Sequence, residues 1–166
     1  MKKYILVFLL FTIYLNSYSQ NISYKDLIFI MNSSETERID ELLTKRGYLL
    51  GEVSNSNDCD SFEWNFKNLN QKPNNIHIVK KFCDEHNNKV VAYSTTNPNF
   101  YQSIKTEVLN EKYKKIGENT YGNMLNVAYK KGDYNFQFSK KNVEKINNET
   151  FILNQYVILL RVHMNE

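Results

Sequence analysis

The stretch that decides the fold is CDSFEWNF, residues 59–66, followed after a polar loop by IHIVKKFC, residues 76–83. In the first run, Phe62, Trp64 and Phe66 alternate with polar residues, which is the period of a half-buried strand. The connecting loop carries a proline and several asparagines, residues that favour turns. The sequence therefore predicts an antiparallel hairpin.

The register of this hairpin follows from folding it about residue 71. That register places Trp64 opposite Ile78 and aligns one apolar face. It also places Cys59 opposite Cys83, which are the only two cysteines of the chain. Two cysteines in an exported protein favour a single disulfide. We therefore predict a Cys59–Cys83 disulfide between neighbouring strands.

The alternative for the same end of the hairpin is a metal site. Cysteine, histidine and carboxylate side chains are all zinc ligands, and several flank the two cysteines: Asp58, Asp60, Asp84 and His86. A disulfide and a thiolate metal site exclude each other. Because an oxidising compartment favours the disulfide, we expect no metal and no other cofactor.

The N-terminus has the pattern of an export signal. Two lysines precede an apolar run at 4–15, and the small residues Ser17 and Ser19 follow it. We expect a bacterial signal peptide over 1–19, and one mature domain over 20–166 located in the periplasm or outside the cell. The apolar run is shorter than the roughly 20 residues of a spanning helix, so we expect no stable membrane insertion after cleavage.

Charge argues against nucleic acid as a partner. The formal net charge of the chain is +3, and removing the two lysines of the expected signal peptide leaves 3 − 2 = +1. A nearly neutral domain has no electrostatic attraction for phosphates. The aromatic content of 14% supplies enough large side chains for a core.

The first half of the mature chain begins with two helical patterns. Residues 23–31 have an apolar helical face behind Ser23, an expected N-cap. A second helix starts at Ser34, which has a glutamate three residues later in capping-box spacing, and ends at Gly47. Four strand patterns follow, at 48–53, 59–67, 76–83 and 89–95.

The second half has the same order of elements. A helix opens at Asn97-Pro98 and runs to Glu111, and strand patterns follow at 113–118, 121–130, 134–140 and 150–162. Gly132-Asp133 is a two-residue hairpin turn that pairs Tyr129 with Phe136. The last strand is apolar on both faces near its centre, so we expect it to be central in the sheet.

The two halves share a short similarity. Residues 43–52 and 109–118 each lead from a helix into a strand that carries a tyrosine and then Gly-Glu. Together with Lys45-Arg46-Gly47-Tyr48 and the Trp64 strand, this pattern resembles the β-lactamase inhibitor protein family and related exported helix-plus-sheet proteins. The resemblance implies a fold and names no target, because no inhibitory loop residue matches.

We therefore predict an α+β fold in which two helix-then-antiparallel-meander repeats, about 23–96 and 97–163, form one curved antiparallel sheet with helices packed on one face. The side chains expected beneath the helices are Trp64, Phe66, Ile76, Ile78, Tyr129 and Phe136. The opposite face is expected to show polar and small residues, namely Ser61, Glu63, Asn65, His77, Lys81, Asn126, Ala128, Asn135 and Gln137.

No catalytic motif stands out. The chain has no Gly-x-Ser-x-Gly motif and no glycine-rich phosphate loop. The acidic residues at 35–41 lie near a helix start, where they complement the helix dipole. We therefore expect no enzymatic activity and assign no catalytic residue.

The functional prediction is a non-enzymatic exported module that binds an unidentified protein, as an inhibitor or immunity-like protein. If Tyr156, Ile158 and Leu160 face the helices, an apolar strip of partner-binding residues faces outward: Leu153, Val157 and Leu159. An apolar strip in a polar surround is typical of a binding patch, and the alternative is that a loop of the chain covers it. The alternatives are a small metal-dependent hydrolase and a structural envelope component.

Overall fold

The structure is a computed structural model, and it describes residues 21–55, 59–66, 76–143 and 153–162. The elements in chain order are α2 (Tyr24–Asn32), α3 (Thr36–Lys45), β1 (Tyr48–Asn55), β2 (Asp60–Phe66), β3 (His77–Cys83), β4 (Lys89–Thr95), α4 (Pro98–Asn110), β5 (Lys114–Tyr121), β6 (Met124–Lys131), β7 (Tyr134–Val143) and β8 (Leu153–Val162). The predicted signal peptide lies outside the described residues.

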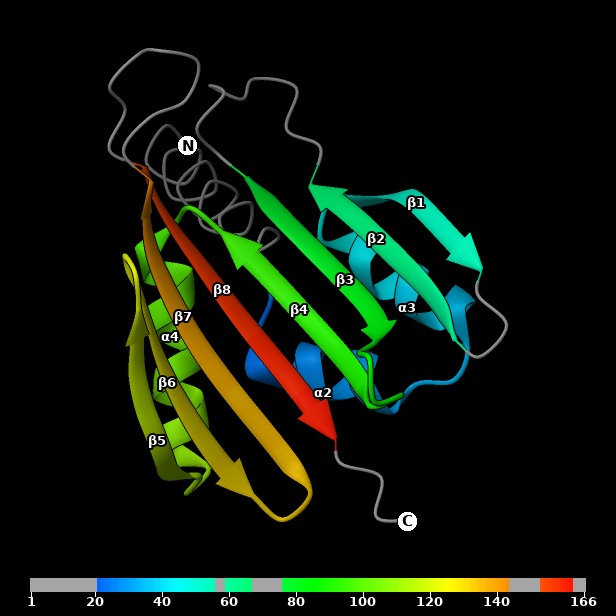
Figure 1. The fold of residues 1–166 in the computed structure, drawn as a ribbon. Coiled ribbons are helices and arrows are strands. Elements are labelled where there is room, and N and C mark those ends of the chain that lie inside the picture. Colours follow the sequence, from blue (N-terminus) through cyan, green and yellow to red (C-terminus); the bar gives the residue numbers. More distant parts are fainter. Residues whose placement is uncertain (1–20, 56–58, 67–75, 144–152, 163–166) are drawn as a thin grey trace, which may run out of the picture.

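All eight strands form one antiparallel sheet in the order β1-β2-β3-β4-β8-β7-β6-β5. Each run of four strands is a meander, and the two runs meet where β4 pairs with β8. The three described helices lie on one face of the sheet: α3 is behind β2, α2 is behind β4 and β8, and α4 is behind β6 and β7 (Figure 1). Residues of α4 also come close to β4 and β8. The α+β class, the antiparallel sheet, the single helical face and the central position of β8 are as predicted.

Local signals explain two of the three helix starts. Ser23 caps α2 in a capping box, accepting from the Asp26 amide while the Asp26 carboxylate accepts from the Ser23 amide. Asn97 caps α4 by accepting from the Asn99 amide, ahead of Pro98 in the first turn. The prediction for α3 was wrong, because its N-cap is Glu35, without a side-chain cap bond, instead of Ser34.

The second-half hairpin has the predicted register. Val127 pairs with Phe138 and Tyr129 with Phe136, across a turn in which Gly132 has a φ of +57°. All four side chains are buried on the helical side, where Ile158 and Leu160 of β8 and Ile104 and Val108 of α4 complete the core.

The register of the first hairpin differs from the prediction by one residue. Trp64 pairs with Val79, not with Ile78, and Asn65 pairs with Ile78. A slip of one residue moves every side chain of a strand to the other face. The predicted core positions Ile76 and Ile78 are therefore wrong: Ile76 is exposed and Ile78 is half-buried on the face without helices.

The next hairpin along the chain decides this register. β3 pairs with β4 so that Val79 lies opposite Tyr93 and Lys81 lies opposite Val91. Tyr93 and Val91 are fully buried beneath the helices, so the odd-numbered residues of β3 must face the same way. The run IHIVKKFC carries apolar residues on both faces, so its own pattern is compatible with either register.

The same slip corrects the predictions for His77 and Lys81, which were expected on the polar outer face. His77 is buried on the helical side between the rings of Phe66 and Phe100. Lys81 is half-buried there, and its ammonium donates to the Ser33 carbonyl at the C-terminal end of α2. A cation is favourable at that end of a helix. Burial lowers the pKa of both side chains.

Candidate functional site

The candidate site lies on the face of the sheet that the described helices leave uncovered, along its central strands. Val157 of β8 lies between Ser94 of β4 and Ser139 of β7, and Leu159 is flanked in the same way by Ala92 and Gln137. Directly paired residues share a face. Because Tyr156, Ile158 and Leu160 are buried beneath the helices, Val157 and Leu159 point to the opposite face.

Two of the three predicted strip residues therefore lie where the sequence placed them. Val157 and Leu159 are half-buried, neither fully covered nor fully open. Leu153 belongs to β8 and pairs with Val143, but its side chain lies outside what the structure describes. The central strip is the name used here for the outward residues Val157 and Leu159 together with their apolar neighbours Ile78, Phe82, Val90 and Ala92 on β3 and β4.

The slipped register adds apolar neighbours that the sequence analysis missed. Ile78 and Phe82 of β3 now face outward, both half-buried, next to Val90 and Ala92 of β4, which are 1% and 8% exposed. The only sequence feature that indicated their outward position was that the β3 run has apolar residues on both of its faces. The central strip is therefore wider than predicted, spanning β3, β4 and β8.

Polar side chains border the central strip on the side of β2. Lys80 forms an ion pair with Glu63, which also accepts from Asn65 at 3.0 Å. The hydrogen bond from Lys80 is the main effect and lowers the pKa of the Glu63 carboxyl; burial opposes it, and the hydrogen bond from Asn65 lowers the pKa further. Glu63 and Asn65 thus lie on the predicted polar face.

On the side of β7 the border is a hydrogen-bonded network. The Asn126 Oδ1 atom accepts from the Ser139 hydroxyl at 2.6 Å and from the Gln137 amide at 3.3 Å. Asn126 donates in turn to Asn119 at 3.1 Å, and Arg161 donates to Gln137 Oε1 at 3.3 Å. These hydrogen bonds link the polar side chains of this flank to one another.

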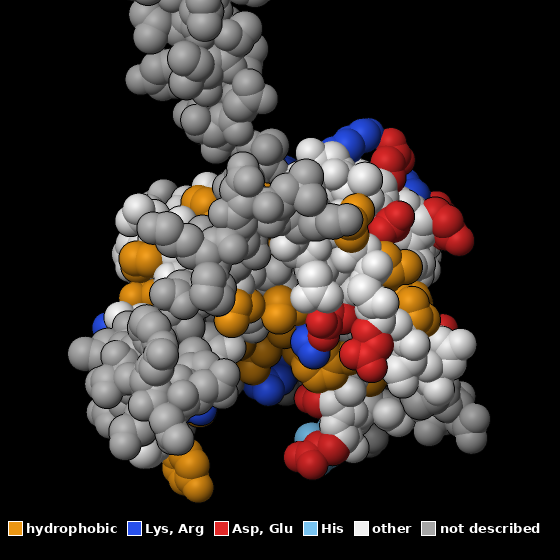
Figure 2. Space-filling model, turned by 90° about the horizontal axis from the view of Figure 1, so that it is seen from above, with side chains coloured by type: hydrophobic (Ala, Val, Ile, Leu, Met, Phe, Trp, Pro, Cys, Tyr) orange, Lys and Arg blue, Asp and Glu red, His pale blue; other side chains and the backbone are white. Residues whose placement is uncertain are grey.

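A hollow of about 680 Å³ opens beside the central strip, at the end of the sheet that carries the disulfide. Its lining combines charged, polar and apolar groups: Glu52, Ser54, Cys59, Ser61, Phe62, Glu63, Lys80, Lys81, Phe82, Cys83, Asp84 and Asn87. Phe82 belongs to both features and connects them. Figure 2 shows hydrophobic side chains gathered beside basic and acidic ones on the described surface.

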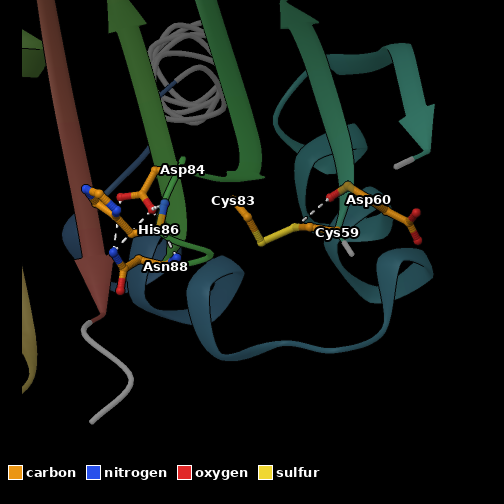
Figure 3. Close-up of a disulfide and its surroundings, with 6 residues drawn as sticks. All are labelled: Cys59, Asp60, Cys83, Asp84, His86 and Asn88. Carbon is orange, nitrogen blue, oxygen red and sulfur yellow. Dashed lines mark hydrogen bonds between the residues drawn. A yellow bond between two sulfur atoms is a disulfide. The ribbon is translucent and has the colours of Figure 1, made fainter. Parts of the chain in front are cut away.

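Cys59 and Cys83 form the predicted disulfide, with a Cα–Cα distance of 6.0 Å. Figure 3 shows it joining the end of β3 to the segment before β2, while Asp60 points away and Asp84, His86 and Asn88 lie on the other side. In the part of the chain that the structure describes, no three His, Cys, Asp or Glu residues are grouped to hold a metal ion.

Of the residues considered as zinc ligands, Asp58 lies outside the described residues, and Asp84 has a structural role. Asp84 Oδ1 accepts from the backbone amides of His86 and Asn88, each at 3.0 Å, and holds the turn between β3 and β4. Burial raises the pKa of Asp84, but these hydrogen bonds and Arg161, 3.8 Å away, outweigh it and lower the pKa. The carboxylate is thus a structural anion.

Comparisons with known proteins identify no relative: no family model matches the chain, and no curated protein or solved structure does either. Within the described residues, no helix is long and apolar enough to cross a bilayer.

Proposed function

We propose that this chain is an exported, non-enzymatic module that binds another protein through the central strip, as an inhibitor or immunity-like protein. The observation that carries the proposal is the position of Val157 and Leu159. They are half-buried apolar side chains at the middle of a sheet face that the described helices leave uncovered. Interfaces of this kind combine an apolar centre with a polar rim.

The surroundings of the strip support a protein as the ligand. One border carries the Glu63–Lys80 ion pair and the other carries the Asn126–Ser139 network, which suits a rim that sets specificity and orientation. The adjoining hollow is open and mixed in character, whereas small-molecule sites are mostly enclosed and apolar. A side chain of the partner would enter the hollow while its backbone covers the strip.

The proposal also includes an internal repeat, in which each half of the chain is one helix-plus-meander unit. Each half starts its meander with a buried tyrosine, Tyr48 or Tyr113. In each case the strand register shifts three residues later, at Gly51 in β1 and at Ile116 in β5. Bulges are structural devices that families retain, so their matched position supports a duplicated helix-plus-meander unit. This plan agrees with the resemblance to β-lactamase inhibitor proteins.

Export is supported by the disulfide. Disulfides persist in oxidising compartments and are rare in the reducing cytosol, and the Cys59–Cys83 bond uses both cysteines of the chain. A location in the periplasm or outside the cell places any partner there too.

The test is affinity capture from the envelope fraction with three forms of the protein: wild type, Val157→Lys and Gln102→Lys. Gln102 is exposed on α4, on the helical side, so its substitution is the matched control. We expect wild type and Gln102→Lys to capture the same protein and Val157→Lys to lose it, with unchanged circular dichroism and thermal midpoint. Equal capture by all three contradicts the proposal. Unfolding of Val157→Lys also contradicts it, since the residue would then be part of the core.

A further inference from the structure

The edge strand β1 is an unused pairing surface. It pairs with β2 on one side, and no other described strand lies on its outer side. After Tyr48, every residue of the strand is exposed, and three are large aliphatic side chains: Leu49 at 44%, Leu50 at 42% and Val53 at 49%. An exposed apolar edge strand is a template for another strand.

The opposite edge of the sheet also exposes apolar side chains, Ile116 and Tyr121, but it carries more charge. β5 carries Lys114, Lys115 and Glu118 among its eight residues, and charged side chains, especially lysine, are the usual means by which an edge avoids pairing. β1 has only one charge, Glu52, and neither lysine nor proline. Both edge strands contain a bulge, at Gly51 in β1 and at Ile116 in β5. The bulge is therefore not what distinguishes the two edges.

The faces of β1 follow from its pairing with β2. Leu50 lies opposite Trp64 and Val53 lies opposite Phe62, and the ring of Trp64 contacts α3 through its hydrogen bond to Asp40. Leu50 and Val53 are therefore both on the helical side of the edge. The bulge at Gly51 brings this about, because residues three apart in a regular strand face opposite ways.

One register allows two copies of β1 to pair with each other. In an antiparallel two-fold pair whose axis lies between residues 51 and 52, Leu50 of one copy faces Val53 of the other, twice. Gly51 then faces Glu52 of the second copy, so the two carboxylates do not oppose each other. Leu49 faces Ser54 on the other side of the sheet. This register places like faces together.

We propose that two copies of this chain associate through antiparallel pairing of their β1 strands, with Leu50 and Val53 forming the apolar contact. The two sheets then join into one continuous sheet, and the helices of both copies lie on the same side. A two-fold contact is closed, so the β5 edges, with their lysines, remain at the two ends. Figure 1 shows β1 at the outer margin of the sheet, remote from β5, and Figure 2 shows hydrophobic surface on that flank.

The association is expected to be reversible. A single strand pair buries less than the roughly 1,600 Å² of a standard protein interface. The contact is separate from the central strip, since Leu50 and Val53 lie on the helical side and Val157 lies on the other. Glu52 and Ser54 of β1 also line the hollow beside the strip, so dimerisation is measured with the isolated chain, in the absence of a partner.

Cysteine pairing tests the register. Leu50→Cys and Val53→Cys are made separately, mixed, oxidised and analysed on non-reducing gels. The proposed register places residue 50 opposite residue 53, so the mixture should give a covalent dimer in clearly higher yield than either variant alone. Tyr121→Cys, exposed on β5, is the control and should stay monomeric. A yield in the mixture no higher than in the single variants overturns the proposal.

Light scattering across a concentration series tests the association itself. The wild-type mass should rise towards twice that of one chain and stop there. Val53→Lys and Leu50→Lys should remain monomeric with an unchanged thermal midpoint, whereas Tyr121→Lys should dimerise like wild type. A wild-type protein that stays monomeric, lysine variants that still dimerise, or a mass that rises without limit each overturns the proposal.

Discussion

Replacing Asp26 with alanine tests the contact that holds the two N-terminal helices together. Asp26 is 6% exposed in the first turn of α2. One carboxylate oxygen accepts from the amide and the hydroxyl of Ser23, both at 2.7 Å, and the other accepts from Arg46 Nη2 at 2.7 Å. Arg46 follows α3 and also donates to the Asn21 carbonyl at 2.9 Å. The carboxylate thus ties the start of α2 to the end of α3.

The expected cost follows from these contacts. Breaking a buried ion pair by removing one partner costs about 3–5 kcal/mol. The Arg46 side chain is 27% exposed, so the lower end of that range applies, and we expect Asp26→Ala to lower the free energy of unfolding by about 3 kcal/mol. Arg46→Met removes one of the three bonds to the carboxylate and should cost about 2 kcal/mol. The double variant should cost less than the sum, because the shared contact is lost only once.

The assay is denaturant unfolding of the two single variants, the double variant and a control. Lys45→Met is the control, since Lys45 pairs with Glu41 on the exposed side of α3, and exposed pairs contribute little to stability. We expect its midpoint to match wild type. If Asp26→Ala unfolds at the same midpoint as Lys45→Met, or if the two single effects add fully, Asp26 and Arg46 do not form the stabilising contact described here.

Two further predictions concern pH and the disulfide. Burial lowers the pKa of His77 from 6.5, and its Nδ1 atom lies 2.9 Å from the Thr95 hydroxyl, so the native state keeps the ring neutral while the unfolded chain takes up a proton. The free energy of unfolding should therefore fall as pH drops below about 6.5, and His77→Gln should weaken this dependence. Replacing Cys59 and Cys83 together with serine should lower the free energy of unfolding by about 3 kcal/mol, from the closed-loop entropy for a sequence separation of 24. A loss below about 1 kcal/mol would contradict that account, and thiol titration of the denatured, unreduced wild type should find no free thiol.

Local chemistry made much of this fold predictable from sequence. Ser23 and Asn97 mark helix starts because short polar side chains bond to free amides. Gly132 marks the β6–β7 turn because that turn needs a positive φ, and its two-residue length then determines which residues pair. For the candidate site, the alternation of β8 correctly placed Val157 and Leu159 opposite the buried Tyr156, Ile158 and Leu160.

Tertiary structure decided what local patterns left open. The sequence of β3 has apolar residues on both faces, so its register depends on β4, whose Val91 and Tyr93 must lie beneath the helices. That choice turns Ile78 and Phe82 outward to widen the central strip and turns His77 inward. No strand pattern states which strands are neighbours, so neither the pairing of β4 with β8 nor the open edge at β1 follows from the sequence alone. Both depend on contacts between residues far apart in the chain. The arrangement of lowest free energy is set by the burial of the whole sheet and not by the preference of any one segment.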